Sequence, residues 1–412
     1  TVYPWSSKDD YVSAFAPGYV GDQMFGVTGG LLSRAKVNFP EEPETVTENI
    51  REIAPQFVMF ISRMWESIAS MIQAKMLDAN IIKRTSYNLF LPVGYKIVEL
   101  EVSGVKPNPF WRAIHFVGNL LVFRPLRDKI GLNELRFCVT AGGTLSPDCF
   151  HLFRAIGVPM KQLFGSTEFI PATGHGMRPS DFESIGYVAP GTELKVTEDD
   201  EILMRAEHMF LGYYKKPEKT EEDLGGGWFH TGDAAYIDDE GRVIYWDRVK
   251  ELVQLPSGAK YPPQYIEGKL KFSPFVKDCM SIGGGDRGFV SAIVAIDFDV
   301  GGRWAEAHHV PYTTITDLSQ KDEFIDLIKK DLRRVNRTLP EEQRVRKFVN
   351  LHKEFDPDEA ELTRTRKLRR SYMEDRYGGM IDAMYSGKDI YTMEVPIIYR
   401  DGRQGVIKTI IK

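Results

Sequence analysis

The sequence predicts an incomplete α/β large domain, with mixed and parallel sheets covered by helices, followed by a smaller α+β domain. The chain has 412 residues, which is long for a single hydrophobic core and favours two or three domains. From residue 135 onward, strand, helix and strand alternate in the order of a βαβ unit, which is typical of a parallel sheet. Beyond residue 250, helices and strands follow an α+β pattern. We therefore expect one domain over residues 1–247 and a second over residues 248–412.

The first part of the large domain predicts short elements. Residues 1–40 read as short strands and loops with one apolar helix. Residues 45–53 have helical spacing, and Thr45 with Glu48 three residues later matches a capping box. Pro55 then ends the helix.

The centre of the large domain predicts buried strands that end in polar loops. Residues 57–60 (FVMF) predict one strand, and the amphipathic stretch 62–76 predicts the helix after it. RFCVTAGG places a second buried strand directly before the glycine pair 142–143. A further strand over residues 159–163 runs into residues 164–168.

In the second domain, residues 265–270 and 322–339 predict helices, and residues 276–282 and 289–296 predict strands. The intervening residues 283–288 contain G-x-G-x-x-G, but a dinucleotide fold needs a helix after these glycines. Because a strand follows, we interpret the glycines as a hairpin loop.

The composition excludes several classes of protein. A net charge of −5 argues against nucleic acid as a partner. Cys138, Cys149 and Cys279 lie far apart without a C-x-x-C, so we expect neither a disulfide framework nor a structural zinc site. A reducing, cytoplasmic compartment is the default for such a chain. No apolar run reaches the length that spans a membrane.

A predicted hairpin near the domain boundary carries the strongest signal of a site. The polar cluster 238–241 separates two strand-like runs, with Asp233 at one end of the hairpin and Arg248 at the other. A carboxylate can accept hydrogen bonds from two vicinal hydroxyls, and an arginine can donate to the same sugar or to a phosphate. The pair therefore suits a ribose, although each fragment alone is more often a turn or a surface ion pair.

Two loops are expected to meet at one edge of the parallel sheet. Ligands bind where the carboxyl ends of neighbouring parallel strands form a crevice. Residues 142–143 and 164–168 follow successive strands, so we expect them to share that edge. The alternative for Ser-Thr-Glu in the second loop is a helix N-cap.

The combined pattern resembles the AMP-forming acyl-CoA synthetases of the adenylate-forming superfamily. The matching features are Thr-Gly-Asp, a hairpin, D-R-x-K-E, a glycine loop and P-x-x-I-E. F-G-S-T-E at residues 164–168 and F-x-G-Y-Y-x-x-P-E-x-T at residues 210–220 extend the resemblance. The resemblance implies a reaction in two halves. A fatty carboxylate attacks ATP to give acyl adenylate and pyrophosphate, and coenzyme A then displaces AMP.

The resemblance also implies roles for individual residues. Phe164 would stack on the adenine, Thr167 would hydrogen-bond the α-phosphate and Glu168 would bind Mg²⁺. Lys367 would reach the reacting carboxylate and the α-phosphate, and would complete the catalytic set with Thr167 and Glu168. The other nucleotide-binding residues would be Gly142, Gly143, Gly165, Ser166, Asp233 and Arg248.

In the second domain, the resemblance implies a hinge and a path for the thiol. Lys250 would be the hinge about which the small domain turns between the two half-reactions; a solvated linker residue is the alternative. A loop that includes Leu255, Gly258 and Lys260 would line the path of coenzyme A. The basic run at residues 362–370 otherwise reads as a solvated face.

Residues 77–125 favour the long-chain branch of the resemblance. They are rich in aromatic side chains, which suits an insertion that shapes an acyl tunnel or makes a peripheral contact with a membrane. The alternative is a helical hairpin packed on the main core. The expected partners are thus a fatty acid, ATP and coenzyme A, while acyl length and oligomeric state are not predicted.

One feature of the family has no match in the sequence. Its Ser/Thr/Gly-rich phosphate loop ends in a lysine, and V-T-G-G at residues 27–30 lacks both the length and the lysine. We therefore expect that the N-terminal part of the large domain is absent and that this chain alone forms no acyl adenylate. The alternatives are a short-chain, aryl or luciferase-like adenylating enzyme and a non-catalytic nucleotide-binding protein.

Overall fold

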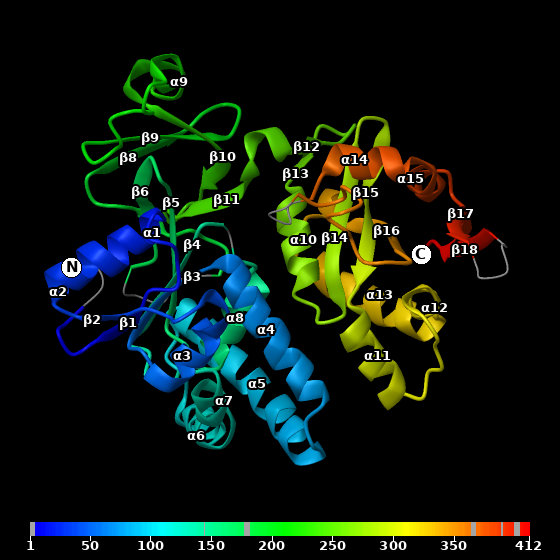
Figure 1. The fold of residues 1–412 in the computed structure, drawn as a ribbon, viewed down its shortest axis with the longest axis horizontal. Coiled ribbons are helices and arrows are strands. Elements are labelled where there is room, and N and C mark those ends of the chain that lie inside the picture. The colour runs from blue at the N-terminus through cyan, green and yellow to red at the C-terminus, as the bar shows by residue number, and fades with distance from the viewer. Residues whose placement is uncertain (1–4, 144, 177–181, 364–367, 389, 399–403) are drawn as a thin grey trace. The chain divides into compact units, whose positions relative to one another are not determined.

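The computed structural model describes residues 5–143, 145–176, 182–363, 368–388, 390–398 and 404–412 (Figure 1). The chain forms two compact units, Thr1–Val249 and Lys250–Lys412. The division falls two residues after the predicted one, because Arg248 ends a strand of the first unit. Each unit combines sheets with helices, and the predicted fold class is confirmed.

The first unit is built on a seven-stranded sheet in the order β2-β1-β3-β4-β5-β6-β7. Its strands β1 to β5 pair in parallel, whereas β5–β6 and β6–β7 pair antiparallel. All of β4 and most of β3 are buried, as expected for parallel strands covered on both faces. The strands are β1 (Asp10–Val12), β2 (Lys36–Asn38), β3 (Phe57–Ile61), β4 (Phe137–Ala141), β5 (Met160–Ser166), β6 (Phe169–Gly174) and β7 (Tyr187–Val188).

Aromatic side chains join helices to both faces of this sheet. Phe25 packs against Phe57 on one face, with ring centroids 5.2 Å apart. On the other face Phe60 packs against Trp65, at 5.0 Å. The helical elements up to β5 are α1 (Val20–Asp22), the π-helix η1 (Gln23–Gly29), α2 (Gly30–Ser33), the 3₁₀ turn η2 (Pro43–Thr45), α3 (Val46–Ile53), α4 (Ser62–Leu77), α5 (Ile81–Val102), α6 (Pro109–Gly118), the π-helix η3 (Asn119–Phe123), α7 (Arg124–Lys129) and α8 (Pro147–Ala155).

The predicted capping box at the start of α3 is wrong. Thr45 makes no side-chain cap to that helix. The chain instead enters α3 through the turn η2, whose own capping box joins Glu42 and Thr45. The hydroxyl of Thr45 lies 3.2 Å from the backbone nitrogen of Glu42 and is therefore occupied one turn earlier than expected.

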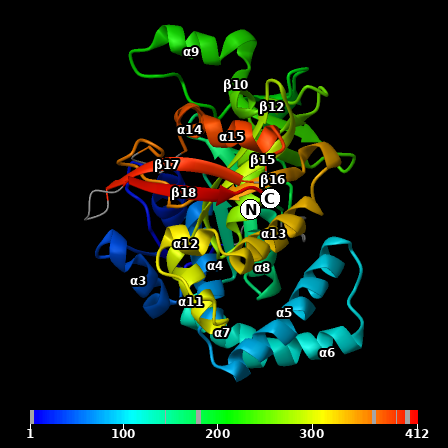
Figure 2. The same ribbon diagram turned by 90° about the vertical axis from the view of Figure 1, so that its right-hand side faces the viewer.

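The aromatic-rich segment forms a helical hairpin. Helices α5 and α6 lie side by side and project from the sheet of the first unit (Figure 2). α5 packs closely on α8, since a Cβ on Gly94 would lie 2.4 Å from the carbonyl oxygen of Ala155. The interpretation as a hairpin packed on the main core is confirmed. Within the described residues, no helix has the length and apolar character needed to cross a membrane.

A second, antiparallel sheet completes the first unit, in the order β11-β10-β9-β8. The predicted hairpin is confirmed as strands β10 and β11. Phe169 of β6 shares a hydrophobic core with Phe229 of β10, which joins the two sheets. The elements are β8 (Thr192–Val196), β9 (Glu201–Ala206), α9 (Pro217–Asp223), the 3₁₀ turn η4 (Gly225–Gly227), β10 (Phe229–Ile237) and β11 (Val243–Arg248).

The second unit packs helices on the three-stranded sheet β14-β15-β16. The glycine run joins β14 to the antiparallel β15, with Gly284 opposite Arg287, which confirms the hairpin interpretation. The elements from the boundary onward are the 3₁₀ turn η5 (Val249–Glu251), β12 (Val253–Gln254), β13 (Lys260–Tyr261), α10 (Pro263–Lys271), β14 (Val276–Gly284), β15 (Arg287–Ile296), α11 (Phe298–Ala307), α12 (Ile315–Ser319), α13 (Asp322–Asn336), the 3₁₀ turn η6 (Glu341–Gln343), β16 (Val345–Asn350), α14 (Arg370–Arg376), α15 (Gly378–Tyr385), β17 (Ile390–Ile398) and β18 (Gln404–Ile410).

Candidate functional site

The glycine pair after β4 and the turn after β5 lie at the same edge of the first sheet, because β4 and β5 are parallel neighbours. Gly142 and Gly143 have φ angles of 76° and 144°, which L side chains rarely adopt. Ser62, which follows β3, donates from Oγ to the carbonyl oxygen of Gly143 at 2.6 Å. Three successive strands of the sheet therefore build this edge.

Residues 164–168 comprise the end of β5 and the two-residue turn Thr167-Glu168 into β6, where Ser166 pairs with Phe169. A Cβ on Gly165 would lie 2.7 Å from the carbonyl oxygen of Phe169, so the turn requires glycine. The alternative of a helix N-cap is wrong, because the chain folds straight back as the antiparallel strand β6.

The side chains of this turn differ in exposure. Thr167 is exposed at the tip of the turn, whereas Phe164 is partly buried. The ring of Phe164 lies 5.8 Å from that of Tyr245 in β11, so it links the edge of the first sheet to the hairpin. The hydroxyl of Ser166 is buried close to the carboxylate of Glu168.

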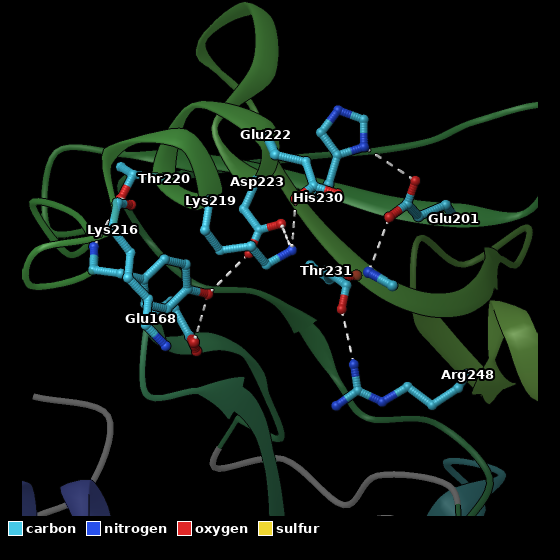
Figure 3. Close-up of polar contacts among 12 residues, drawn as sticks. Glu168, Glu201, Lys216, Lys219, Thr220, Glu222, Asp223, His230, Thr231 and Arg248 are labelled. Carbon is cyan, nitrogen blue, oxygen red and sulfur yellow. Dashed lines mark hydrogen bonds and ion pairs between the residues drawn. The ribbon is translucent and has the colours of Figure 1, made fainter.

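Glu168 lies in a cluster of polar groups between the two sheets of the first unit (Figure 3). Tyr213 Oη is 2.9 Å from Glu168 Oε1 and 3.0 Å from Asp223 Oδ2. Lys219 Nζ in turn lies 2.7 Å from Asp223 Oδ1. Burial alone would raise the pKa of Glu168, but the nearby hydroxyls of Ser166 and Tyr213 and the backbone amide hold that pKa below its ordinary value. Glu168 is thus a charged acceptor at neutral pH.

The Thr-Gly-Asp motif forms a bulge in strand β10. His230 pairs with Leu203 and Ala234 pairs with Glu201, so three residues of β10 lie opposite one residue of β9. Gly232, within the bulge, has a φ of 67°, and its amide donates to Glu201 Oε1 at 2.9 Å (Figure 3). The bulge re-aims the side chain that follows the glycine, which is a common use of bulges next to functional sites.

Asp233, which follows this bulge, is the cross-strand partner of Arg248. Arg248 Nε lies 3.1 Å from Asp233 Oδ1, and Arg248 Nη1 donates to the carbonyl oxygen of Thr231 at 2.9 Å. Tyr245 Oη is a more distant donor to Asp233 Oδ1, at 3.4 Å. Within the described chain, Asp233 Oδ2 has no hydrogen-bond partner. This arrangement leaves one oxygen of a well-oriented carboxylate available to a ligand.

Burial controls the charge of this carboxylate. Burial raises the pKa of Asp233 to about 6, although Arg248 and Tyr245 both favour the charged form. The carboxylate of Glu201 on the neighbouring strand raises the pKa further. The group is therefore mainly ionised at pH 7, at a cost in folding free energy.

Glu168 fits a Mg²⁺ ion that is held together with a nucleotide. In the described part of the chain, no group of three or more His, Cys, Asp or Glu side chains could hold a metal by itself. Mg²⁺ is commonly bound through one or two carboxylates together with substrate phosphates and water. A single charged carboxylate at the sheet edge meets that requirement.

The predicted residues of the second unit have different environments. Lys250 is exposed in the turn η5, at the start of the unit. The turn between β12 and β13 is closed by Gly258, whose amide donates to the carbonyl oxygen of Leu255 at 2.9 Å. Leu255 is buried in the unit, whereas Lys260 is partly exposed. Lys367 lies outside the described residues.

Three residues of the site were missed in the sequence. Ser62 braces Gly143 and Glu201 braces Gly232, and only the fold reveals these contacts between distant residues. Tyr213 did carry a signal, because it lies in the F-x-G-Y-Y stretch. The chain bends at Gly212 (φ 138°) within that stretch, and the bend delivers Tyr213 to Glu168.

Comparison with known proteins agrees with this architecture. The family model for AMP-binding enzymes matches residues 1–214, and the model for the AMP-binding enzyme C-terminal domain matches residues 250–389. The chain belongs to the AMP-binding enzyme family, and the resemblance to adenylate-forming acyl-CoA synthetases is confirmed.

Relatives of the chain are named fatty-acid–CoA ligases. The long-chain-fatty-acid–CoA ligase FadD15 of Mycobacterium tuberculosis is 26% identical, over 86% of this chain and 58% of its own length. The long-chain-fatty-acid–CoA ligase heimdall of Drosophila melanogaster is 25% identical, over 92% of this chain and 62% of its own length. The chain thus spans about three fifths of the length of these relatives.

A solved structure shows the same fold. The adenylation domain of a carboxylate reductase from Mycobacterium chelonae matches with a TM-score of 0.64 and 20% identity, over 92% of this chain and 54% of its own.

Proposed function

We propose that this chain supplies the adenylate site and the C-terminal domain of an AMP-forming fatty acid–CoA ligase. In the first half-reaction, the carboxylate of a fatty acid attacks the α-phosphorus of ATP and releases pyrophosphate. In the second, the thiol of coenzyme A attacks the acyl carbon and releases AMP. The names of the relatives support the fatty acid as substrate.

The observation that carries this proposal is the carboxylate of Asp233 beside Arg248, which is largely buried but has one oxygen without a hydrogen-bond partner among the described residues. A ribose offers two adjacent hydroxyl donors, and the free oxygen of Asp233 would accept from them. Arg248, more than half exposed, keeps guanidinium donors for the same sugar or for a phosphate.

The other residues of the first unit would complete the nucleotide site. Phe164 would stack on the adenine, and Thr167 would hydrogen-bond the α-phosphate from the exposed tip of the turn. The open backbone of Gly142 and Gly143 would approach the nucleotide closely. Glu168 would hold Mg²⁺, which supplies positive charge against the phosphates.

The second unit would act on the acyl group. Lys367 would reach the reacting carboxylate and the α-phosphate, and Lys250 would be the hinge between the two half-reactions. Lys260 and the backbone around Gly258 would line the path of the thiol, whereas the side chain of Leu255 is committed to the core.

The choice of acid can be tested without the first half-reaction. We would supply the chain with preformed palmitoyl adenylate or benzoyl adenylate, together with coenzyme A, and measure the acyl-CoA formed. The proposal predicts that palmitoyl-CoA forms at least about tenfold faster, which corresponds to 1.4 kcal/mol of transition-state preference. Faster transfer of benzoate would favour an aryl ligase. Binding of AMP without transfer of either acyl group would favour a non-catalytic nucleotide-binding protein.

The helical hairpin supports a further part of the proposal, a peripheral contact with anionic membranes. Residues 81–129 contain eight lysines and arginines against three acidic residues, in a chain of net charge −5. Exposed apolar side chains gather on α6 and η3, namely Phe110, Phe116, Val117, Leu120 and Leu121. The same segment carries exposed basic side chains without an ion pair among the described residues, namely Lys83, Arg84, Lys106, Arg112 and Arg124. Apolar and basic groups together suit an anionic lipid surface.

Vesicle sedimentation tests this contact. The chain should bind vesicles that contain phosphatidylserine more strongly than vesicles of phosphatidylcholine alone, and added salt should weaken the binding. Replacing Phe116 and Leu120 by glutamate should abolish it, whereas Leu211→Glu, at a fully exposed leucine elsewhere, should not. Equal binding by all variants would contradict the contact. Loss of a dimer instead of vesicle binding would show that the hairpin joins two copies of the chain.

A further inference from the structure

Tyr213 presents one hydroxyl to two carboxylates. Its Oη lies 2.9 Å from Glu168 Oε1 and 3.0 Å from Asp223 Oδ2, both within hydrogen-bond distance. A tyrosine hydroxyl carries a single proton and can donate it to only one acceptor at a time, while ionised carboxylates can only accept. The two carboxylates therefore compete for this proton.

The competition is unequal, because a cation stands beside only one of the two carboxylates. Lys219 Nζ, one turn earlier on α9, is 2.7 Å from Asp223 Oδ1 (Figure 3). Among the described residues, no cation pairs with Glu168. Tyr213 is therefore a neutral donor to Glu168 beside the hydroxyl of Ser166 and the backbone amide, whereas Asp223 keeps a charged partner without it.

The backbone fixes Tyr213 in this place. The amide of Phe210 donates to the carbonyl oxygen of Glu168 at 3.0 Å, so the segment is attached to the turn from both sides of Gly212. The amide of Tyr213 donates to the hydroxyl of Thr220 at 2.9 Å. A Cβ on Gly212 would lie 2.7 Å from the methyl group of Thr220, so the approach requires glycine.

We propose that Tyr213 is a positioning residue that holds the carboxylate of Glu168 for a Mg²⁺-bound nucleotide. When Mg²⁺ binds to Glu168, the hydroxyl of Tyr213 would donate its hydrogen bond to Asp223 instead. The ion pair of Asp223 with Lys219 would then hold the ring of Tyr213 in place. This inference rests on the proposed function, because it assumes that Glu168 meets the metal. Partners that orient a metal ligand typically contribute tenfold or more to metal affinity.

The experiment measures how strongly Mg²⁺ promotes ATP binding. Calorimetry gives the Kd of ATP for the whole chain in EDTA and in saturating Mg²⁺. The ratio of the two Kd values measures how much Mg²⁺ strengthens the binding of ATP. Tyr213→Phe should lower this ratio about tenfold and leave the Kd in EDTA within about twofold. Tyr214→Phe is the matched control, since that neighbouring side chain is 85% exposed and should behave like the wild type.

Each outcome bears on the inference. A wild-type ratio in Tyr213→Phe would overturn it, and so would equal losses in Tyr213→Phe and Tyr214→Phe. A rise in both Kd values of Tyr213→Phe would show a merely structural role. If Glu168→Gln retains the wild-type ratio, the metal does not meet Glu168 and the inference fails with that assignment. If the wild-type chain binds no ATP at all, the proposed function itself fails, which the EDTA measurement distinguishes.

Discussion

Two acid–arginine pairs have their acids in neighbouring motifs, at Asp233 and Glu267, yet their surroundings differ. Asp233 meets Arg248 through one contact at 3.1 Å, and the arginine side chain is 56% exposed. Glu267 meets Arg370 with both carboxylate oxygens at 2.8 Å, and also accepts from the amide of Ser281 at 2.8 Å. Glu267 is saturated with donors, whereas Asp233 keeps an open oxygen. A saturated buried carboxylate stabilises a fold, and an unsaturated one is available to a ligand.

Electrostatics separates the pairs in the same way. Burial raises the pKa of Asp233 to about 6, because the donors around it do not offset the loss of water. For Arg370, burial would lower the pKa, but the carboxylate of Glu267 reverses this and raises it. The first pair is thus under electrostatic strain at neutral pH, and the second is not.

The largest effect should follow from removing the carboxylate of the saturated pair. Glu267→Ala removes the bidentate partner of the largely buried Arg370 and leaves it only Glu251, 3.5 Å away, which should cost about 3 kcal/mol in the unfolding of the second unit. Hydrogen exchange of β14 and α10 during chemical denaturation would measure this loss. Glu342→Ala, at an exposed acid of η6, is the control. A loss below about 1 kcal/mol would mean that the pair is no more than a surface ion pair.

The fold could be read from the sequence where local pattern and tertiary structure agree. The strand at residues 57–60 and the hairpin around residues 238–241 have the buried runs and turn residues that define them. For the turn at Glu168 a helix N-cap stayed open as an alternative to the loop, because Ser-Thr-Glu has the same local chemistry in both settings. Only the antiparallel return of β6 decides between them.

The site was less predictable because its supporting contacts join distant residues. Tyr213 and Glu168 are 45 residues apart, and Gly232 and Glu201 are 31 apart. A single sequence marks the residues at the ends of strands, but it does not show which side chains brace them. Asp233 and Glu267 both lie in clear motifs. The sequence therefore does not show that the donors around Glu267 saturate its carboxylate, whereas those around Asp233 do not.

The second prediction concerns the strain at Asp233. A carboxyl whose pKa rises on folding destabilises the folded state above pH 6 and has no effect below its unfolded pKa of about 3.8. Asp233→Asn should therefore stabilise the first unit by about 3 kcal/mol at pH 8 and by only about 0.5 kcal/mol near pH 4. Urea unfolding at both pH values measures this, with Asp239→Asn, at an exposed loop residue, as the control. If the stability difference between Asp233→Asn and the wild type is the same at both pH values, burial does not destabilise the charged form of Asp233.

Binding of adenosine should show the same titration with a smaller effect. Adenosine carries no phosphate, so the pH dependence reports the protein. As the pH falls from 7 to 5, protonation of Asp233 should weaken adenosine binding by about tenfold, the effect of one unit below a pKa of about 6. The profile of Asp233→Asn should be flat, and an equally steep profile in that variant would assign the titration to another group.

The smallest effect should come from the arginine of the open pair. Arg248→Lys keeps the charge but loses the fork that contacts both Asp233 and the carbonyl oxygen of Thr231. Because the side chain is more than half exposed, we expect a change below about 1 kcal/mol in stability. Arg370→Lys, in the saturated pair, should cost more. Equal losses in both variants, measured by urea unfolding, would erase the distinction between the pairs.

The most direct test asks whether Asp233 recognises the hydroxyls of a ribose. Calorimetry would compare AMP with 2′,3′-dideoxy-AMP on the wild-type chain, on Asp233→Ala and on the exposed control Asp239→Ala. Hydrogen bonds to a charged group contribute roughly 1.5–3 kcal/mol, so the wild type and the control should prefer AMP by about tenfold or more. Asp233→Ala should bind both nucleotides with the same affinity. If Asp233→Ala keeps the full preference for AMP, Asp233 does not hold the ribose and the central claim is wrong.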